Sequence, residues 1–490
     1  MNWHWLVTRL YPNGKPFGYK FQLRITICMV KHTQPKEGQV RKSYKRVPVI
    51  RRSHAMWMSP RVWKPRLVFW CGALAIGIIS VGFAEAADIA QDWFHSLTSG
   101  SPLRAWLPLL ITPLGFMFCS WVALVWFPNS GGSGIPQAIA ARHLNDHEDR
   151  SLLLSIRVAT GKIVLTIIGL FCGASIGREG PTVQIGASIM LQAARFGGME
   201  KARGLILAGS AAGIAAAFNT PLAGIVFAIE EMGRAYAART NGLVLSAVIL
   251  AGLASLGLVG NYNYFGFTTV TASTGKDWIL TIACGIFGGA FGAAFSALAL
   301  NMGRRVRRRV QKAPLRNMVI FAGICGLLVA LIGIASGGMT FGAGYDQARS
   351  AVEGATLPPF YFVEKFTVGL LSMISGIPGG IFAPSLSVGA GLGSTIGLLL
   401  GTSASLAAVL GMAGYFAGAV QAPMTAFVII LEMTGNHSNV IPLMCASMLG
   451  YGTARLISHE PLYHALSRIF VADILRQRRA REKTIQPELT

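Results

Sequence analysis

Five long apolar stretches constrain the fold of this 490-residue chain more than any other feature. They cover residues 66–84, 107–127, 278–300, 318–335 and 386–416. A transmembrane helix needs about 20 consecutive, mostly apolar residues, so each stretch is long enough to cross a bilayer. Only 13% of the residues are charged, whereas about 25% is usual for a soluble protein. The chain is therefore predicted to be an all-α polytopic membrane protein.

Two glycine-rich segments interrupt the apolar sequence, GREGP at residues 177–181 and GGIFAP at residues 379–384. In lipid, unpaired backbone N–H and C=O groups have no water partner, so a broken helix is tolerated only where it lines a cavity. A helix that begins there points its free N–H groups and positive dipole end into the cavity, which suits an anion. Glu179 lies in the first break, and the combination predicts anion transport with a protonatable gate.

The chain also contains an internal repeat. Residues 208–232 resemble residues 410–433, with Gly209, Pro221 and Glu230 each found again 202 positions later. The two broken segments have nearly the same separation. We therefore predict two repeat halves of tilted and broken helices, at about 66–260 and 277–473, with a site between them. Recurrent Gly, Ala and Pro in membrane helices is the alternative explanation.

The net charge of +23 is concentrated outside the apolar stretches. Residues 1–65 hold fourteen lysines and arginines against one acid, and further clusters lie at 304–316 and 476–483. Basic clusters that flank membrane spans mark the cytoplasmic side. We expect a poorly ordered basic N-terminal segment at 1–65, a transmembrane domain at 66–475, a basic tail at 476–490, and both termini in the cytoplasm. Nucleic-acid binding is not expected, because no reader module accompanies these clusters.

The 20 acidic residues are few enough for each one near an apolar stretch to be a functional candidate. An ionised Glu179 is itself an anion that could occupy an anion site, and protonation would release it. Its alternative is a structural pair with Arg178. Glu230 and Glu231 end a nearly acid-free helix and point about 100° apart, so one can face inward while the other stays at a solvated helix end.

Two neutral hydroxyl groups are candidate anion ligands. Ser133 lies in GGSGIP at residues 131–136 and Tyr463 lies in PLY at 461–463. A hydroxyl donates a hydrogen bond without a charge that would trap the anion. An ordinary Gly-Ser loop and a tyrosine at the membrane interface are the alternatives. The seven scattered cysteines show no metal spacing or disulfide framework, and we expect neither a metal nor another cofactor.

Five motifs together resemble the CLC family of chloride channels and chloride/proton antiporters. They occur in the family's order within residues 66–473, as GSGIP at 132–136, GREGP at 177–181, AAAFNTPLAGIVFAIEEM at 215–232, GGIFAP at 379–384 and PLY at 461–463. The resemblance implies the CLC fold, a homodimer in which every subunit contains two inverted repeats and its own anion pathway. The regulatory paired domains of eukaryotic members have no counterpart here, which favours a bacterial protein of the inner membrane.

The resemblance also implies roles for individual residues. Ser133 and Tyr463 would supply hydroxyls to a central chloride, and the backbone N–H groups of Ile381 and Phe382 would complete its site. Glu179 matches the external gating glutamate and Glu231 the internal proton-transfer glutamate of antiporters. Glu230 would lie beside the proton route. The serine at 133 is the type associated with chloride preference, and the proline of GREGP argues against the fluoride-exporting branch.

One residue departs from the family pattern, since members often carry a glutamate where this chain has Gln137. We expect anion binding to persist there with altered local electrostatics. The leading hypothesis is a chloride/proton antiporter, and the alternative is a passive voltage- or pH-gated chloride channel of the same family, which often lacks the internal glutamate. An intramembrane enzyme would need a nucleophile–base pair or metal ligands, which the sequence does not offer, so no enzymatic activity is expected. A membrane scaffold without transport activity is the remaining alternative.

Overall fold

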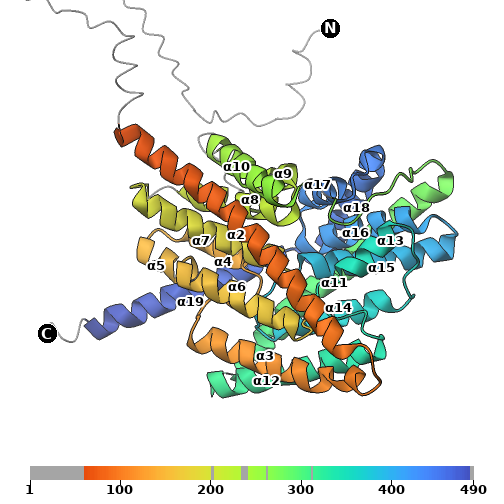
Figure 1. Ribbon diagram of the computed structural model, residues 1–490, viewed down its shortest axis with the longest axis horizontal. Helices are drawn as coiled ribbons and strands as arrows, with labels where there is room; N and C mark the ends of the chain where they lie inside the picture. Colours follow the sequence, from red (N-terminus) through yellow and green to blue (C-terminus); the bar gives the residue numbers. More distant parts are fainter. Residues whose placement is uncertain (1–59, 200–202, 233–240, 261–262, 311–312, 486–490) are drawn as a thin grey trace, which may run out of the picture. The chain divides into compact units, whose positions relative to one another are not determined.

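The computed structural model describes residues 60–199, 203–232, 241–260, 263–310 and 313–485. Most of the predicted basic N-terminal segment therefore lies outside the described residues, and residues 60–65 begin the first helix. The described residues are helical, with two isolated β-bridges and no strand among them. This is the predicted all-α architecture, and Figure 1 shows its many oblique helices.

The first half of the chain begins with one very long helix and contains several short ones. Its elements are α2 (Pro60–Thr98), η2 (Arg104–Trp106), α3 (Pro108–Val125), α4 (Ile135–His143), α5 (His147–Leu153), α6 (Ile156–Phe171), α7 (Glu179–Phe196), α8 (Arg203–Phe218), α9 (Pro221–Phe227), η3 (Ala228–Met232) and α10 (Asn241–Val259).

The second half repeats this pattern of long and short helices. Its elements are α11 (Gly275–Val310), α12 (Pro314–Ala335), α13 (Tyr345–Val352), α14 (Tyr361–Ile374), α15 (Phe382–Leu400), α16 (Ala404–Val420), α17 (Pro423–Thr434), η5 (His437–Asn439), α18 (Val440–Ile457) and α19 (Leu462–Ile485).

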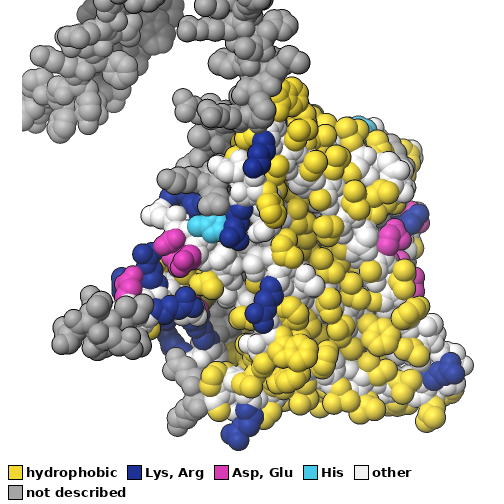
Figure 2. All heavy atoms as spheres, turned by 60° about the vertical axis from the view of Figure 1, so that its left-hand side comes forward, with side chains coloured by type: hydrophobic (Ala, Val, Ile, Leu, Met, Phe, Trp, Pro, Cys, Tyr) yellow, Lys and Arg dark blue, Asp and Glu magenta, His cyan; other side chains and the backbone are white. Residues whose placement is uncertain are grey.

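Among the described residues, eight helical stretches are long and apolar enough to cross a membrane, which confirms the polytopic class. Figure 2 shows a broad hydrophobic surface on one face, with most charged side chains toward its margins. The apolar stretch at 386–416 is not one helix, however. Gly401 ends α15 in the left-handed conformation (φ 64°), and α16 begins at Ala404. A glycine adopts this conformation at no steric cost, which permits the sharp turn.

Reciprocal contacts relate the two halves of the chain. The carboxylate of Glu432 accepts hydrogen bonds from the N–H groups of Leu222 and Ala223 at the start of α9. The carboxylate of Glu230 accepts from Met424 and Thr425, the equivalent positions of α17. An exchange in which each half makes the same contact to the other is the mark of two-fold symmetry. Helices α9 and α17 accordingly lie side by side (Figure 1), as expected for inverted repeats.

Glycine contacts pack the helices of each half closely. Gly186 of α7 touches Gly209 of α8, and Gly389 of α15 touches Gly411 of α16, with a backbone carbonyl against each glycine. A β-carbon at any of these four positions would collide with the neighbouring helix. Small residues therefore let the broken helices approach each other, which substitutes for the hydrophobic driving force that lipid does not provide.

Candidate anion-binding and proton-transfer site

Backbone hydrogen bonds join the two broken segments at the boundary between the repeats. Gly177 and Gly380 exchange N–H to carbonyl bonds of 2.8 and 2.7 Å. Gly132 donates to the carbonyl of Ile377 and accepts from Gly379, each at 3.1 Å. The starts of α4, α7 and α15 are thereby held together, and their free N–H groups and positive dipole ends converge on one region.

The loop that carries Ser133 is held in place by a buried lysine. Nζ of Lys162, from α6, donates to the carbonyls of Gly132 at 2.7 Å and Gly131 at 3.5 Å. The lysine is fully buried, and no acid forms an ion pair with it among the described residues. The second half repeats the device, because Lys365 of α14 donates to the carbonyls of Thr340 and Gly342.

The structure accounts for the glutamine at position 137. Its Oε1 accepts from the N–H of Gly134 at 3.1 Å, and its Nε2 donates to the carbonyl of Gly131 at 2.6 Å. A glutamine can satisfy both an N–H and a carbonyl, whereas an ionised glutamate only accepts. Gln137 therefore closes the loop around Ser133 without adding a charge.

Ser133 and Tyr463 come together although 330 positions separate them in the sequence. Both are buried, with exposed fractions of 6% and 0%, and the two hydroxyls are close enough for an electrostatic interaction without meeting the geometry of a hydrogen bond. Neither hydroxyl has a hydrogen-bond partner in the part of the chain that the structure describes. Because buried polar groups are normally hydrogen-bonded, two unsatisfied hydroxyls at a meeting of helix starts fit a site for an anion.

Phe382 forms the aromatic wall of this region. Its ring lies 6.0 Å from that of Tyr463 and 4.8 Å from that of Phe416, measured between centroids. Phe382 is the first residue of α15, and Ile381 is its N-cap. The two predicted N–H donors are thus at the start of α15, and the role of these groups in anion binding stays a prediction.

Glu179 is the first residue of α7 and is completely buried. Its Oε1 accepts a hydrogen bond from the hydroxyl of Tyr345, the first residue of α13. Its Oε2 has no hydrogen-bond partner among the described residues, and it lies beside Gly177, next to Ala383 in the first turn of α15. The carboxylate therefore lies where the N-terminus of α15 would stabilise an anion.

Arg178 does not neutralise its neighbour through an ion pair. Its guanidinium pairs with Asp88 at 2.7 Å and donates to the hydroxyl of Tyr264 at 2.6 Å. It also lies 5.3 Å from the ring centroids of Tyr264 and Tyr345. The structural pair of Glu179 with Arg178, the alternative considered above, is not the arrangement found.

A cavity of about 280 Å³ opens beside this group, and Arg178 and Tyr345 form part of its wall. Four acids, Glu85, Asp88, Asp92 and Asp346, also line it. The hydroxyl of Tyr345 thus connects a polar cavity to the buried carboxylate of Glu179.

Glu230 and Glu231 have separate environments, as their 100° separation predicted. Glu231 lies in a π-helical turn, Ala228–Met232, and its side chain is 3% exposed. Nε2 of His464 lies 3.1 Å from the Glu231 carbonyl and 3.8 Å from its carboxylate. Single π-helical turns are often found at functional sites. Glu230 caps α17 instead, so its contacts are structural.

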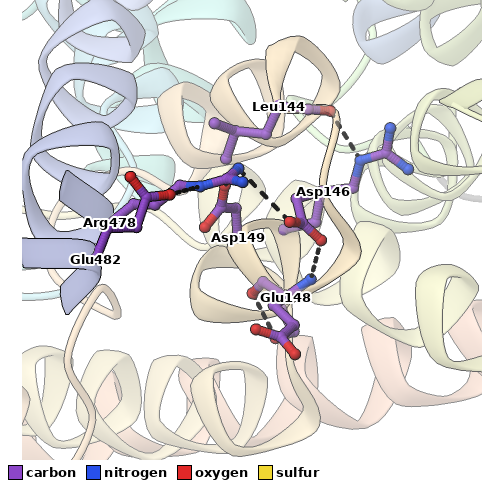
Figure 3. Close-up of polar contacts among 8 residues, drawn as sticks. Leu144, Asp146, Glu148, Asp149, Arg478 and Glu482 are labelled. Carbon is purple, nitrogen blue, oxygen red and sulfur yellow. Dashed lines mark hydrogen bonds and ion pairs between the residues drawn. The ribbon is translucent and has the colours of Figure 1, made fainter. Parts of the chain in front are cut away.

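His464 connects the two candidate groups, because it directly follows Tyr463 and contacts Glu231. It also lines a cavity of about 480 Å³ with His143 and Ser467. Helix α19, which carries both Tyr463 and His464, is tied to α5 further along its length. Arg478 reaches Asp146 and Asp149 at 3.5 and 3.4 Å (Figure 3).

Sequence reasoning missed Tyr345, His464 and the two buried lysines. The repeat offered a signal for the lysines. Lys162 and Lys365 are 203 residues apart, and so are the first residues of α7 and α15, so the lysines occupy equivalent positions in the two halves. The loop at 342–347 (GAGYDQ) also parallels 132–137 (GSGIPQ), with Tyr345 at the position of Ile135. No group of three or more metal-ligating side chains occurs within the described ranges.

Comparison with known families and sequences gives a consistent result. The sequence model of the family described as "Voltage gated chloride channel" matches residues 115–455. The H(+)/Cl(-) exchange transporter ClcA of Yersinia pestis bv. Antiqua (strain Angola) is 31% identical over 455 residues, covering 87% of this chain and 92% of the relative. ClcA of Citrobacter koseri is 30% identical over 437 residues, covering 82% and 89%.

Solved structures show the same fold. A slow cyanobacterial Cl-/H+ antiporter superposes with a TM-score of 0.73 at 25% identity, covering 85% of this chain and 99% of the antiporter. A CLC-type fluoride/proton antiporter superposes with a TM-score of 0.69 at 22% identity, covering 82% and 96%.

Proposed function

This chain belongs to the voltage-gated chloride channel family, also called the CLC family, and from that premise we propose that it exchanges chloride for protons across the membrane. Its relatives of about 30% identity are named as H(+)/Cl(-) exchange transporters. The observation that carries the proposal is the buried carboxylate of Glu179, the first residue of α7, which faces the start of α15 near two buried hydroxyls that have no hydrogen-bond partner among the described residues. A side-chain carboxylate there competes with a free anion for the same helix N-terminus.

Glu179 acts as the gate in this mechanism. When ionised it occupies the anion pathway, stabilised by the α15 N-terminus and by the hydroxyl of Tyr345. Protonation removes its charge, so its attraction to the helix N-terminus falls and chloride takes its place. The ionised carboxylate and chloride are thereby alternatives at the same position, so protonation of Glu179 is linked to the entry of chloride.

The central chloride lies between Ser133 and Tyr463. Their hydroxyls donate to it, and the N–H groups of Ile381 and Phe382 complete the coordination. Hydroxyl and N–H donors stabilise the ion without a fixed countercharge, so it can leave again. Lys162 holds the carbonyls of Gly131 and Gly132 and thereby fixes the loop that presents Ser133 to the ion.

Glu231 exchanges protons with the opposite side. It is buried, and the cavity beside His464 provides its aqueous access. A passive channel has no need for a buried acid in this position, which is why exchange is the better proposal. In this mechanism the proton passes between Glu231 and Glu179 through the region of Tyr463.

The experiment that tests this proposal uses purified protein in chloride-loaded liposomes. External pH is recorded while a chloride gradient is imposed. We expect uphill proton movement in the wild type, and chloride flux without proton coupling in Glu179→Gln. Coupled proton flux that persists in this variant would refute the gate. Chloride flux without uphill proton movement in the wild type would instead indicate a channel.

We further propose a homodimer with both termini on the cytoplasmic side of a bacterial inner membrane. The basic clusters at 304–316 and 476–483 support this orientation. Exposed apolar side chains on α10 and α18, including Leu253 and Ile441, provide surface for a second copy or for lipid. A single cysteine introduced on α18 and cross-linked in vesicles distinguishes a second copy from lipid. Contact with a second copy gives a covalent dimer, whereas contact with lipid gives none.

A further inference from the structure

A basic cleft lies between the C-terminal end of α11 and the middle of α19, away from the anion pathway. Its volume is about 420 Å³, and its apolar floor includes Leu300 and Ile469. The cleft residues of α19 recur at helical spacing, at 465, 468, 472 and 476, so one face of the helix lines it. Five arginines and two acids complete the lining, as Arg304, Arg307, Arg308, Arg468, Arg476, Glu460 and Asp473.

The arginines outnumber their acidic partners. Asp473 pairs with Arg307 and lies 3.7 Å from Arg476, and Glu460 pairs with Arg468 at 2.7 Å. Five positive and two negative side chains leave a charge of +3 in the cleft. Within the described residues, neither Arg304 nor Arg308 forms an ion pair. These two cations are available to a ligand.

The dipole of α11 explains the arginines on α11 but not those on α19. Basic residues in the last turn of α11 are favourable near its negative end. That effect needs only residues of α11 and acts equally on Arg305 and Arg309, which face a different hollow beside α12. It does not explain why α19 brings two further arginines to the opposite wall.

We propose that this cleft binds a phosphate-bearing anion. Guanidinium groups bind phosphate through paired N–H donors, and several of them around one concave site suit a group with two negative charges. The volume accommodates a phosphate with a short polar attachment, and the apolar floor accepts carbon atoms. An anionic phospholipid headgroup and a soluble phosphate compound share this chemistry.

A ligand in the cleft would act on transport through α19. This helix carries Tyr463 and His464 in its first turn and supplies Arg468 and Arg476 to the cleft. Further along, Arg478 ties it to α5 (Figure 3). Drawing the two arginines toward α11 changes the tilt of a helix whose first turn forms the anion site. This part of the inference rests on the proposed function.

The test compares two double variants of the full-length protein. Arg304→Gln with Arg308→Gln removes the two unpaired cations, whereas Arg305→Gln with Arg309→Gln removes the same charge from the neighbouring face. Native mass spectrometry with equimolar phosphatidylglycerol and phosphatidylcholine probes the lipid. Titration with inorganic phosphate in phosphatidylcholine nanodiscs probes the soluble anion. Arg476→Gln, on the other wall, is the independent third variant.

We expect at least a tenfold loss of binding of one or both probes in the first double variant and a loss in Arg476→Gln. The second double variant should stay within twofold of the wild type. Retention of phosphatidylglycerol alone identifies a lipid site, and saturable phosphate binding identifies a soluble ligand. Equal losses of binding in both double variants would overturn the proposal. So would a wild type that neither prefers phosphatidylglycerol over phosphatidylcholine nor binds inorganic phosphate saturably.

Transport is measured separately in vesicles with and without phosphatidylglycerol, or with phosphate if that is the probe that binds. We expect chloride flux to respond in the wild type and not in the first double variant. Binding without any response in flux would refute the coupling through α19 and leave the cleft as a site. Absence of chloride flux in every protein would refute the proposed function, while the binding measurements would still stand.

Discussion

Removal of the Tyr345 hydroxyl should make the gate open at a higher pH. Tyr345→Phe keeps the aromatic ring that lies 5.3 Å from the Arg178 guanidinium and deletes the hydroxyl that donates to Glu179. This donor stabilises the ionised carboxylate, which is the form proposed to block the pathway. Without it, the protonated form is favoured at a lower proton concentration.

The magnitude follows from the kind of bond that is lost. A hydrogen bond to a charged group contributes about 1.5–3 kcal/mol. Tyr345 is half-buried beside a polar cavity, so water compensates part of the loss and the lower value, about 1.5 kcal/mol, is appropriate. Because about 1.4 kcal/mol corresponds to one pH unit, the half-maximal pH of chloride flux should rise by about one unit.

Chloride efflux from proteoliposomes, measured across a pH series, reports this midpoint. Tyr361→Phe is the matched control, since it removes a buried hydroxyl that bonds to Ser387 and not to the gate. Tyr345→Phe should have no effect in a Glu179→Gln background, because the acceptor charge is already gone. An unchanged midpoint, or an equal shift in Tyr361→Phe, would show that Tyr345 does not hold the gate.

Three further substitutions test other contacts. Glu231→Gln should abolish proton flux and retain some chloride flux in the liposome assay; undiminished proton flux would place the internal proton site elsewhere. Gln137→Glu puts a buried charge beside the loop of Ser133 and should weaken chloride binding on the order of tenfold by calorimetry, and an unchanged affinity would contradict the electrostatic argument. Glu230→Gln and Glu432→Gln should each lower the free energy of unfolding by about 1 kcal/mol; clearly unequal losses in denaturant unfolding would argue against their symmetric roles.

The positions of the helix breaks could be predicted from sequence because glycine and proline act locally. Helices α7 and α15 begin inside GREGP and GGIFAP, at Glu179 and Phe382. The separation of Glu230 from Glu231 also followed from local geometry, since neighbours on a helix cannot share one environment. These inferences needed only the residues in the motif.

The partners of the same residues depend on contacts across the chain. Tyr345 is 166 positions from Glu179, and His464 is 233 positions from Glu231. No spacing rule connects such pairs, because they meet only after the two halves pack. The division of the apolar stretch at 386–416 into α15 and α16 was likewise not predictable, because composition alone does not show that Gly401 takes the left-handed conformation.

The symmetry of the halves explains why the candidate site is built from both. Helix α9 leaves two N–H groups that Glu432 of α17 satisfies, and α17 depends in the same way on Glu230 of η3, the turn that follows α9. Neither half can satisfy its helix starts in lipid without the other, where an unpaired backbone group costs several kcal/mol. Repetition therefore forces the broken helices to meet. Positions at which the halves differ, such as Glu179 in one and Phe382 in the other, are free to carry the chemistry. The gate is then a local departure from symmetry in a structure that symmetry holds together.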